Sequence, residues 1–284
     1  MRGRRRLRRL QQLVTDLPNL GVGLSFRSTF RADLFAHRDR VDFLEIVADH
    51  YFDAPREKLD ELDLLADHFP LVAHGLDLSL GSAEGIDARY LDKFAALIER
   101  VKPPWWSEHI AFTRAGGVSI GHLAALPRTQ EAVDALACNI DQVKRTIATP
   151  LILENPTEAF AAPGAEMDEP EFVTRVLAAC ECGWLCDVTN ILTNAVNQRR
   201  DIETEIDRWP WERAVQAHFA GGRIAPDGRW IDSHDRPAPP EALDLLGALS
   251  RRGALKGVIL ERDEDIPPFG DLLAELDRAR EAIA

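Results

Sequence analysis

The chain alternates short apolar runs with longer amphipathic stretches eight times. Each apolar run has the length and the Val, Ile, Leu and Phe content of a buried parallel strand, and polar or turn residues bound it. We predict strands at Gly21–Phe26, Phe43–Val47, Leu71–His74, Trp106–Ile110, Leu151–Glu154, Trp184–Asp187, Val215–Phe219 and Val258–Glu261. Helical periodicity between them predicts helices at Arg56–His68, Tyr90–Val101, Glu131–Ile147, Glu171–Ala179, Pro240–Ser250 and Phe269–Ile283.

Eight strands, each followed by a helical or loop segment, predict a single (β/α)8 TIM barrel, which is an α/β fold. The links at Phe30–His37 and in the 190s have the weakest helical pattern. The acidic, proline-containing segment Ala161–Pro170 is expected to be an insertion over one face of the barrel. We assign residues 1–19 to a basic N-terminal arm and residues 20–284 to the catalytic barrel domain.

The charge of the chain excludes some classes of function. The formal net charge is −13, and six arginines lie in the first nine residues, so the other 275 residues carry −13 − 6 = −19. Such an acidic body repels phosphate groups, which argues against nucleic-acid and membrane-surface binding. No apolar run has the roughly 20 residues of a membrane span, and no apolar segment of a signal peptide follows the arginines. We expect a cytoplasmic protein.

Four cysteines are too few and too clustered for a disulfide framework. Cys180, Cys182 and Cys186 do not have the spacing of zinc knuckles, so we expect buried thiols there. The arginine arm is expected to be a surface-lying tail, with nucleic-acid binding as the alternative.

Potential metal ligands fall where the predicted strands end. The active site of a TIM barrel forms at the C-terminal ends of its strands. The third to the eighth predicted strands each end in or carry a histidine or a carboxylate, namely His74, His109, Glu154, Asp187, His218 and Glu261. Three more candidates, Asn190, Asp232 and His234, follow strand ends. Asp232 and His234 alternate in an extended segment, so both side chains are expected to point the same way.

Each of these residues has an ordinary alternative when it is taken alone. A lone histidine is more often a hydrogen-bonded core residue, and Asn190 can cap the helix that follows it. Together, however, four carboxylates in one mouth repel one another unless a cation is present. Mixed histidine and carboxylate ligands suit iron, manganese or zinc, and nine ligands are too many for one ion. The sequence therefore predicts two or more metal ions.

Eight separated motifs, in order from about Gly21 to the C-terminus, resemble those of one known family. They are Phe43-Leu-Glu-Ile, Ala73-His-Gly, Ser107-Glu-His, Leu153-Glu-Asn-Pro, Asp187-x-x-Asn190, His218-Phe-Ala-Gly, Asp232-Ser-His-Asp-x-Pro and Leu260-Glu-Arg-Asp-x-Asp-Ile-Pro. The resemblance is to the domain of unknown function 692 family. Its characterised members are MbnB/TglH-like multinuclear non-heme iron enzymes that modify ribosomally made peptides.

The resemblance implies a TIM barrel with two or three irons, held by the nine candidate ligands, with Glu154 as the bridge. It implies O2-dependent oxidation of a residue, above all a cysteine near the C-terminus, in a precursor peptide. Relatives commonly need a separate partner protein that presents the peptide, so we expect such a partner here.

Four further residues are candidates for substrate contact. Arg27 and Glu45 lie near the predicted mouth, and His50 stands where many relatives have asparagine. A solvent-exposed loop histidine is the alternative for His50. Arg262 lies beside a candidate ligand and is expected to neutralise a peptide carboxylate, with an ion pair to Asp263 or Asp265 as the alternative. Thr189 also departs from the family pattern, in which asparagine stands at this position. The resemblance therefore does not identify the substrate.

Two other functions fit parts of the sequence. A zinc- or manganese-dependent hydrolase or isomerase would use the same ligands on the same barrel. A non-catalytic peptide-binding subunit would keep the barrel as a scaffold, but a scaffold has no need for four carboxylates at one mouth. The spacing of the ligands does not separate the oxidative enzyme from the hydrolase.

Overall fold

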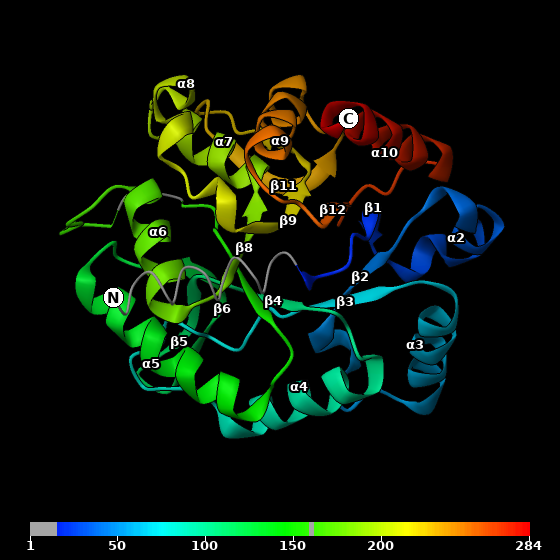
Figure 1. Cartoon of the computed structure of the whole chain (residues 1–284), viewed down its shortest axis with the longest axis horizontal. Coiled ribbons are helices and arrows are strands. Elements are labelled where there is room, and N and C mark those ends of the chain that lie inside the picture. Colours follow the sequence, from blue (N-terminus) through cyan, green and yellow to red (C-terminus); the bar gives the residue numbers. More distant parts are fainter. Residues whose placement is uncertain (1–15, 159–161) are drawn as a thin grey trace.

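A computed structural model describes residues 16–158 and 162–284. The arginines of the predicted arm and Ala161 of the predicted insertion lie outside the described residues. Eight parallel strands close into a barrel in the order β1-β12-β9-β8-β7-β4-β3-β2 (Figure 1), so the predicted TIM barrel is confirmed. The barrel strands are β1 (Gly21–Ser25), β2 (Leu44–Val47), β3 (Leu71–His74), β4 (Trp106–His109), β7 (Leu151–Glu154), β8 (Gly183–Asp187), β9 (Ala214–Phe219) and β12 (Gly257–Leu260).

Helices surround the barrel, and several begin at a residue whose side chain caps them. Asp87, Thr129 and Asp168 each accept a hydrogen bond from a backbone N–H of the first turn. The α-helices are α2 (Arg31–Ala36), α3 (Arg56–His68), α4 (Ala88–Val101), α5 (Gln130–Thr146), α6 (Glu169–Cys180), α7 (Val188–Asn197), α8 (Ile202–Glu205), α9 (Pro240–Arg252) and α10 (Phe269–Ile283). Short 3-10 turns are η1 (Ser28–Phe30), η2 (Arg38–Arg40), η3 (Ala48–Tyr51), η4 (Ile206–Arg208) and η5 (Trp211–Arg213).

The structure corrects the expectation for the two weakly helical links, since α2 and α7 occupy them. Asn194 obscured the pattern of α7, because asparagine is a poor helix former. In the structure its side chain is buried and bonds outside the helix, to the backbone N–H of Glu158 and the carboxylate of Glu169. The predicted insertion also ends earlier than expected, because Glu169 and Pro170 form the first turn of α6.

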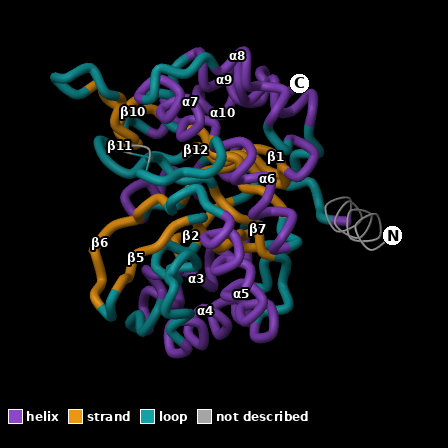
Figure 2. The backbone as a smooth tube through the Cα atoms, turned by 90° about the vertical axis from the view of Figure 1, so that its left-hand side faces the viewer, coloured by secondary structure: helices purple, strands orange, loops and turns teal. Residues whose placement is uncertain are grey.

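Two β-hairpins that the sequence analysis did not predict extend from the C-terminal ends of β4 and β9. The first pairs β5 (Ala111–Ala115) with β6 (Val118–Ala125), and the second pairs β10 (Gly221–Ile224) with β11 (Trp230–Arg236). Figure 2 shows both on the same side of the molecule. The hairpins therefore flank the barrel mouth, at the ends of the strands that carry the predicted ligands.

The strands place two layers of side chains inside the barrel. Residues two apart on a strand point the same way, so on four of the strands an apolar residue and a ligand candidate both face the interior. The pairs are Val72 and His74, Ile152 and Glu154, Leu185 and Asp187, and Ile259 and Glu261. The apolar layer consists of Phe43, Val72, Trp105, Ile152, Leu185, Val215 and Ile259, against which Leu17 and Leu20 pack.

The four cysteines are free thiols, and Cys180, Cys182 and Cys186 are buried as expected. Burial raises the pKa of Cys182 to about 11, so this thiol keeps its proton at neutral pH. In the part of the chain that the structure describes, no helix is long and apolar enough to cross a membrane.

Candidate metal centre

The C-terminal ends of six consecutive barrel strands bring six of the nine predicted ligands to one place. Every one of these residues is buried, with at most 7% of its surface exposed. They are His74 on β3, His109 on β4, Glu154 on β7, Asp187 on β8, His218 on β9 and Glu261 directly after β12. Strand alternation thus turns an ordered series in the sequence into a single cluster inside the barrel mouth.

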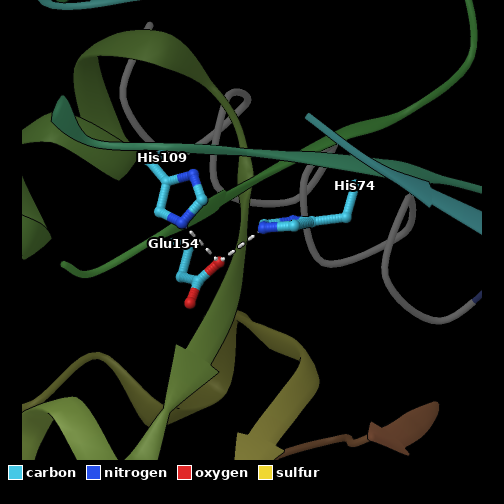
Figure 3. Close-up of side chains that lie close together, drawn as sticks. All are labelled: His74, His109 and Glu154. Atoms are coloured by element: carbon cyan, nitrogen blue, oxygen red, sulfur yellow. Dashed lines mark ion pairs between the residues drawn. The ribbon is translucent and has the colours of Figure 1, made fainter. Parts of the chain in front are cut away.

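The first group of ligand atoms consists of two imidazoles and one carboxylate (Figure 3). His74 Nε2 lies 3.4 Å and His109 Nε2 lies 3.3 Å from the same oxygen, Glu154 Oε2. The two rings meet nearly edge to face, with their centroids 4.7 Å apart. Three donor atoms that converge in this way can hold one metal ion.

The second group shares Glu154 with the first. Ligand atoms of Glu154, Asp187, His218 and Glu261 all lie within 4.8 Å of one another. His218 Nδ1 is 3.5 Å from Glu154 Oε1 and 3.2 Å from Glu261 Oε2. Glu154 therefore directs Oε2 to the first group and Oε1 to the second, which is the arrangement of a carboxylate that can bridge two ions.

Asp232 and His234 approach the second group from the hairpin strand β11. His234 Nε2 lies 2.7 Å from Asp232 Oδ1, and its Nδ1 lies 3.7 Å from Glu261 Oε2. The two side chains therefore meet, as the sequence predicts. The backbone is not regularly extended there, because His234 has φ +49°, a conformation that costs energy for a residue with a Cβ.

Asn190 lies in the first turn of α7 at the edge of the same cluster. The alternative that Asn190 caps this helix is wrong: the cap is Asp187, whose Oδ1 accepts the Asn190 backbone N–H at 2.8 Å. The Asn190 side chain donates to the Asn155 carbonyl at 3.1 Å. The Thr157 hydroxyl, which sequence reasoning missed, bonds to the Asn190 amide oxygen and lies 2.9 Å from Asp232 Oδ2.

Several buried polar atoms of this cluster have no hydrogen-bond partner. A buried polar atom without a partner is costly, so such atoms are rare in native proteins. Here they gather at the predicted ligands: Glu154 Oε2, Asp187 Oδ2 and His218 Nδ1. Imidazole nitrogens and carboxylate oxygens are the donors that bind iron, manganese and zinc, so the residues present fit a metal centre.

Hydrogen bonds on the far side of two rings orient the histidines. His74 Nδ1 lies 2.8 Å from the Ser107 hydroxyl, and His109 Nδ1 lies 3.2 Å from the Gly75 carbonyl. Each contact leaves Nε2 facing Glu154. Partners of this kind fix the tautomer and direction of histidines that bind metals.

Glu45 orients the His218 ring and does not contact substrate, which was its expected role. Its side chain is completely buried beneath the cluster, so the expected contact with substrate is wrong. Glu45 Oε2 lies 2.9 Å from His218 Nε2 and accepts a 2.6 Å hydrogen bond from Gln216. Trp105 in turn donates to Gln216 at 2.7 Å. This chain of buried bonds leaves His218 Nδ1 free to face Glu154 and Glu261.

Protonation balances the charge of the cluster. Burial lowers the pKa of His109, but Glu154 and Glu108 outweigh it and raise this pKa to about 9. Burial raises the pKa of Glu154, but His109 and His218 outweigh it and lower this pKa to about 2. Burial, with the nearby Asp232 and Glu154 carboxylates, raises the pKa of Asp187 well above its usual range. Histidine binds a metal only when neutral, so metal binding here is coupled to proton release.

A cavity of about 720 Å³ opens above the ligands. Leu123 of β6 and Trp230 of β11 line it, so both hairpins contribute walls. Arg27 and His50, the predicted substrate contacts, also line it. Arg27 is held in place by a 2.9 Å hydrogen bond to the Ser25 hydroxyl and an ion pair with Asp263.

The structure does not bring Arg262 to this cavity. Its side chain is buried on the outer side of the barrel and pairs with Glu275 of α10 at 2.6 Å. Glu275 was not among the expected partners, which were Asp263, Asp265 or a substrate carboxylate. The guanidinium is therefore engaged in packing α10 against the end of β12 and is not available to a molecule in the cavity.

Comparison with known proteins assigns the chain to a family. The family model described as "RiPP precursor modification enzyme MbnB/TglH/ChrH" matches residues 21–284. The chain belongs to this family. A family relative from Caulobacter vibrioides, named UPF0276 protein, is 35% identical over 270 residues, which cover 94% of this chain and 95% of the relative. Another, from Shewanella amazonensis, is 32% identical over 269 residues, covering 94% and 95% of the two chains.

Solved structures with a similar fold support the barrel architecture of this family member. D-psicose 3-epimerase from Clostridium cellulolyticum H10 matches with a TM-score of 0.57 at 11% identity, over 93% of this chain and 99% of that one. A D-tagatose 3-epimerase-like protein matches with a TM-score of 0.58 at 16% identity, over 93% and 100%. At such low identity the likeness concerns the fold alone.

Proposed function

We propose that the protein is a multinuclear non-heme iron oxidoreductase that uses O2 to modify a residue of a ribosomally made precursor peptide. The observation that carries the proposal is the position of Glu154, whose two oxygens face two separate groups of buried imidazole and carboxylate donors. Membership in a family of enzymes that modify such precursors supports the peptide as substrate class.

In this proposal two or three iron ions are held by the predicted ligands. Bound iron would supply the electrons and the coordination sites that O2 chemistry requires. Glu154 would bridge, while Asp232 and His234 would close the open side of the second group. The full set is His74, His109, Glu154, Asp187, Asn190, His218, Asp232, His234 and Glu261.

The chain's own residues would position the substrate and keep the metal ligands rigid. The cavity walls from the two hairpins would exclude water from the reacting side chain, which we propose is a cysteine near the peptide's C-terminus. Arg27 and His50, which line the cavity, would contact the peptide. We also propose a separate partner protein that presents the precursor, and the acidic surface of this chain suits a basic partner.

The metal assignment is tested by purifying the protein anaerobically from iron-supplemented cells and measuring its metal content and Mössbauer spectrum. We expect two or three irons per chain. Glu154→Gln should lose more than one equivalent of iron, because a bridging carboxylate serves two ions. The matched control is Glu158→Gln, a buried carboxylate four residues away that pairs with Arg128, which should keep its iron. Equal iron in both variants would refute the bridge.

The reaction class is tested by incubating the iron-loaded protein with peptides encoded near its gene, with and without O2, and measuring peptide mass. We expect a mass change that requires both O2 and iron. Stoichiometric zinc without iron, together with full activity on an ester or a phosphate, would instead establish the hydrolase that the same ligands could support.

A further inference from the structure

A side pocket of about 250 Å³ adjoins the cavity above the metal centre. Arg27, Val47, His50 and Asp263 line both spaces, so they form the boundary between them. The two spaces are therefore direct neighbours. Lys58 of α3 lines the side pocket but not the main cavity.

The cationic group of Lys58 has no anionic partner among the residues that the structure describes. Its Nζ lies 5.2 Å from the centre of the Tyr51 ring, and no carboxylate among residues 16–158 and 162–284 pairs with it. Each of the two acids that line the pocket pairs with a cation other than Lys58. Glu61 pairs with Arg31 at 2.6 Å, and Asp263 pairs with Arg27 and His234.

Arg27 adds a second cation on the side facing the main cavity. Its guanidinium is fixed by Ser25, the Phe26 carbonyl at 2.8 Å and Asp263, so it presents its charge in one direction. The positive potential of the two cations reaches His50: burial lowers the pKa of His50, and Lys58 and Arg27 lower it further. Burial and the two cations therefore both disfavour a charged imidazole at the boundary of the pocket.

We propose that the side pocket binds a carboxylate of the substrate, with Lys58 as its principal cation and Arg27 as the second. This inference rests on the proposed function, because the carboxylate belongs to the peptide whose neighbouring side chain reaches the metal centre. Lysine and arginine form charge-assisted hydrogen bonds with carboxylates, which are about twice as strong as neutral ones. The role that the sequence suggested for Arg262 thus passes to Lys58 and Arg27, which line the side pocket. The carboxylate can come from the end of the peptide or from an acidic side chain.

The pocket is tested first without any peptide. Acetylglycine, which carries a carboxylate, and acetylglycinamide, which does not, are titrated into the full-length 15N-labelled protein loaded with zinc. Acetylglycine should shift the amide resonances of residues 28, 29, 51 and 58, and acetylglycinamide should not. Equal shifts from both probes, or no shifts from either, would overturn the proposal.

Variants on one helix identify the cation. Lys58→Gln should weaken acetylglycine binding about tenfold, as expected for the loss of a hydrogen bond to a charged group. Lys58→Arg should restore most of the affinity, because it restores the charge. The matched control is Arg56→Gln, which removes one positive charge two residues away from Lys58. The Arg56 side chain is 89% exposed and does not line the pocket. If Arg56→Gln weakens binding as much as Lys58→Gln does, the effect is only one of net charge and the proposal is wrong.

Three synthetic peptides then distinguish a terminal carboxylate from an acidic side chain. They also test the side pocket and the oxidative function separately. They are acetyl-Gly-Ala-Cys with a free carboxylate, the same peptide as its amide, and acetyl-Gly-Ala-Cys-Asp as its amide. Tighter binding of the first indicates a terminal carboxylate, and tighter binding of the third indicates an acidic side chain. Carboxylate-dependent binding without any O2-dependent mass change would refute the oxidative function and leave the pocket standing. Oxidation of all three peptides with the same KM, unaffected by Lys58→Gln, would refute the pocket and leave the function standing.

Discussion

The barrel interior has an apolar layer at one end and a layer of buried polar side chains at the other, and the same strands contribute to both. At one end, Ile152 and its neighbours form a close-packed apolar layer. At the other end, buried carboxylates and imidazoles face one another, and several of their atoms lack a hydrogen-bond partner. On β3, β7, β8 and β12 the ligand candidate follows the apolar residue by two positions. The comparison indicates that the apolar end supplies stability, while the polar end keeps an arrangement that a cation satisfies.

The largest expected effect concerns the apolar layer. Ile152→Ala should lower the free energy of unfolding by about 3 kcal/mol, because it opens a cavity in a close-packed interior. The metal content of the folded protein should stay unchanged, since Glu154 is still positioned by the strand. Urea unfolding followed by circular dichroism, with metal analysis of the folded fraction, measures both. A loss of metal in proportion to the loss of stability would show that the two layers do not act separately.

Glu45 connects the two layers, and Glu45→Gln should act mainly on the metal. Glutamine keeps the size of the side chain but removes the charge that supports His218, so metal affinity should fall about 10- to 100-fold. Competition with a chelator of known affinity measures this change. Unchanged affinity would mean that the buried bond from Glu45 to His218 serves packing alone.

Asp187→Asn should have opposite effects on the protein with and without metal. The pKa of Asp187 is raised by burial and by the nearby carboxylates, so its ionised form is destabilised at neutral pH. Asparagine removes that cost and can still cap α7. The free energy of unfolding of the metal-free variant should therefore be about 1 kcal/mol higher than that of the metal-free wild type. The variant should also bind metal more weakly. Destabilisation of the metal-free variant would contradict the contrast between the two layers.

The last expected effect is a pH dependence confined to the polar layer. His109 has a pKa of about 9 in the folded chain, against 6.5 as its ordinary value. A raised histidine pKa contributes stability that is fully present below pH 6.5 and is lost as pH rises through 9. Metal-free protein should therefore lose stability between these pH values, and metal-loaded protein, whose imidazoles are already neutral, should not. Chemical unfolding with and without chelator tests this, and parallel pH profiles would count against the histidines as ligands.

The hairpins show how sequence signals can be present and still be missed. Gly116 and Gly117, both with positive φ, form the turn between β5 and β6, and Gly-Gly between extended segments is a recognised hairpin signal. The expectation of regular βα alternation concealed it. Asp227-Gly228 marks the second hairpin in the same way, with Gly228 at φ +86°.

Other features had no signal in the sequence. Arg262 pairs with Glu275 because α10 packs beside the end of β12, and no local pattern connects those two residues. Glu45 lies 173 positions from His218 along the chain, and only closure of the barrel brings them together. Lys58 likewise lines the side pocket because α3 packs beside the β1 and β2 ends.

The sequence by itself determined the barrel and the residue types at its mouth. Strand period and helix period are local properties, and the rule that strand ends converge then locates the six ligand candidates. The tertiary structure alone decided that Glu154 lies between two ligand groups, which nitrogen of each histidine faces them, and which cations line the side pocket. Those outcomes depend on contacts between segments far apart in the chain, which follow from packing and not from local periodicity.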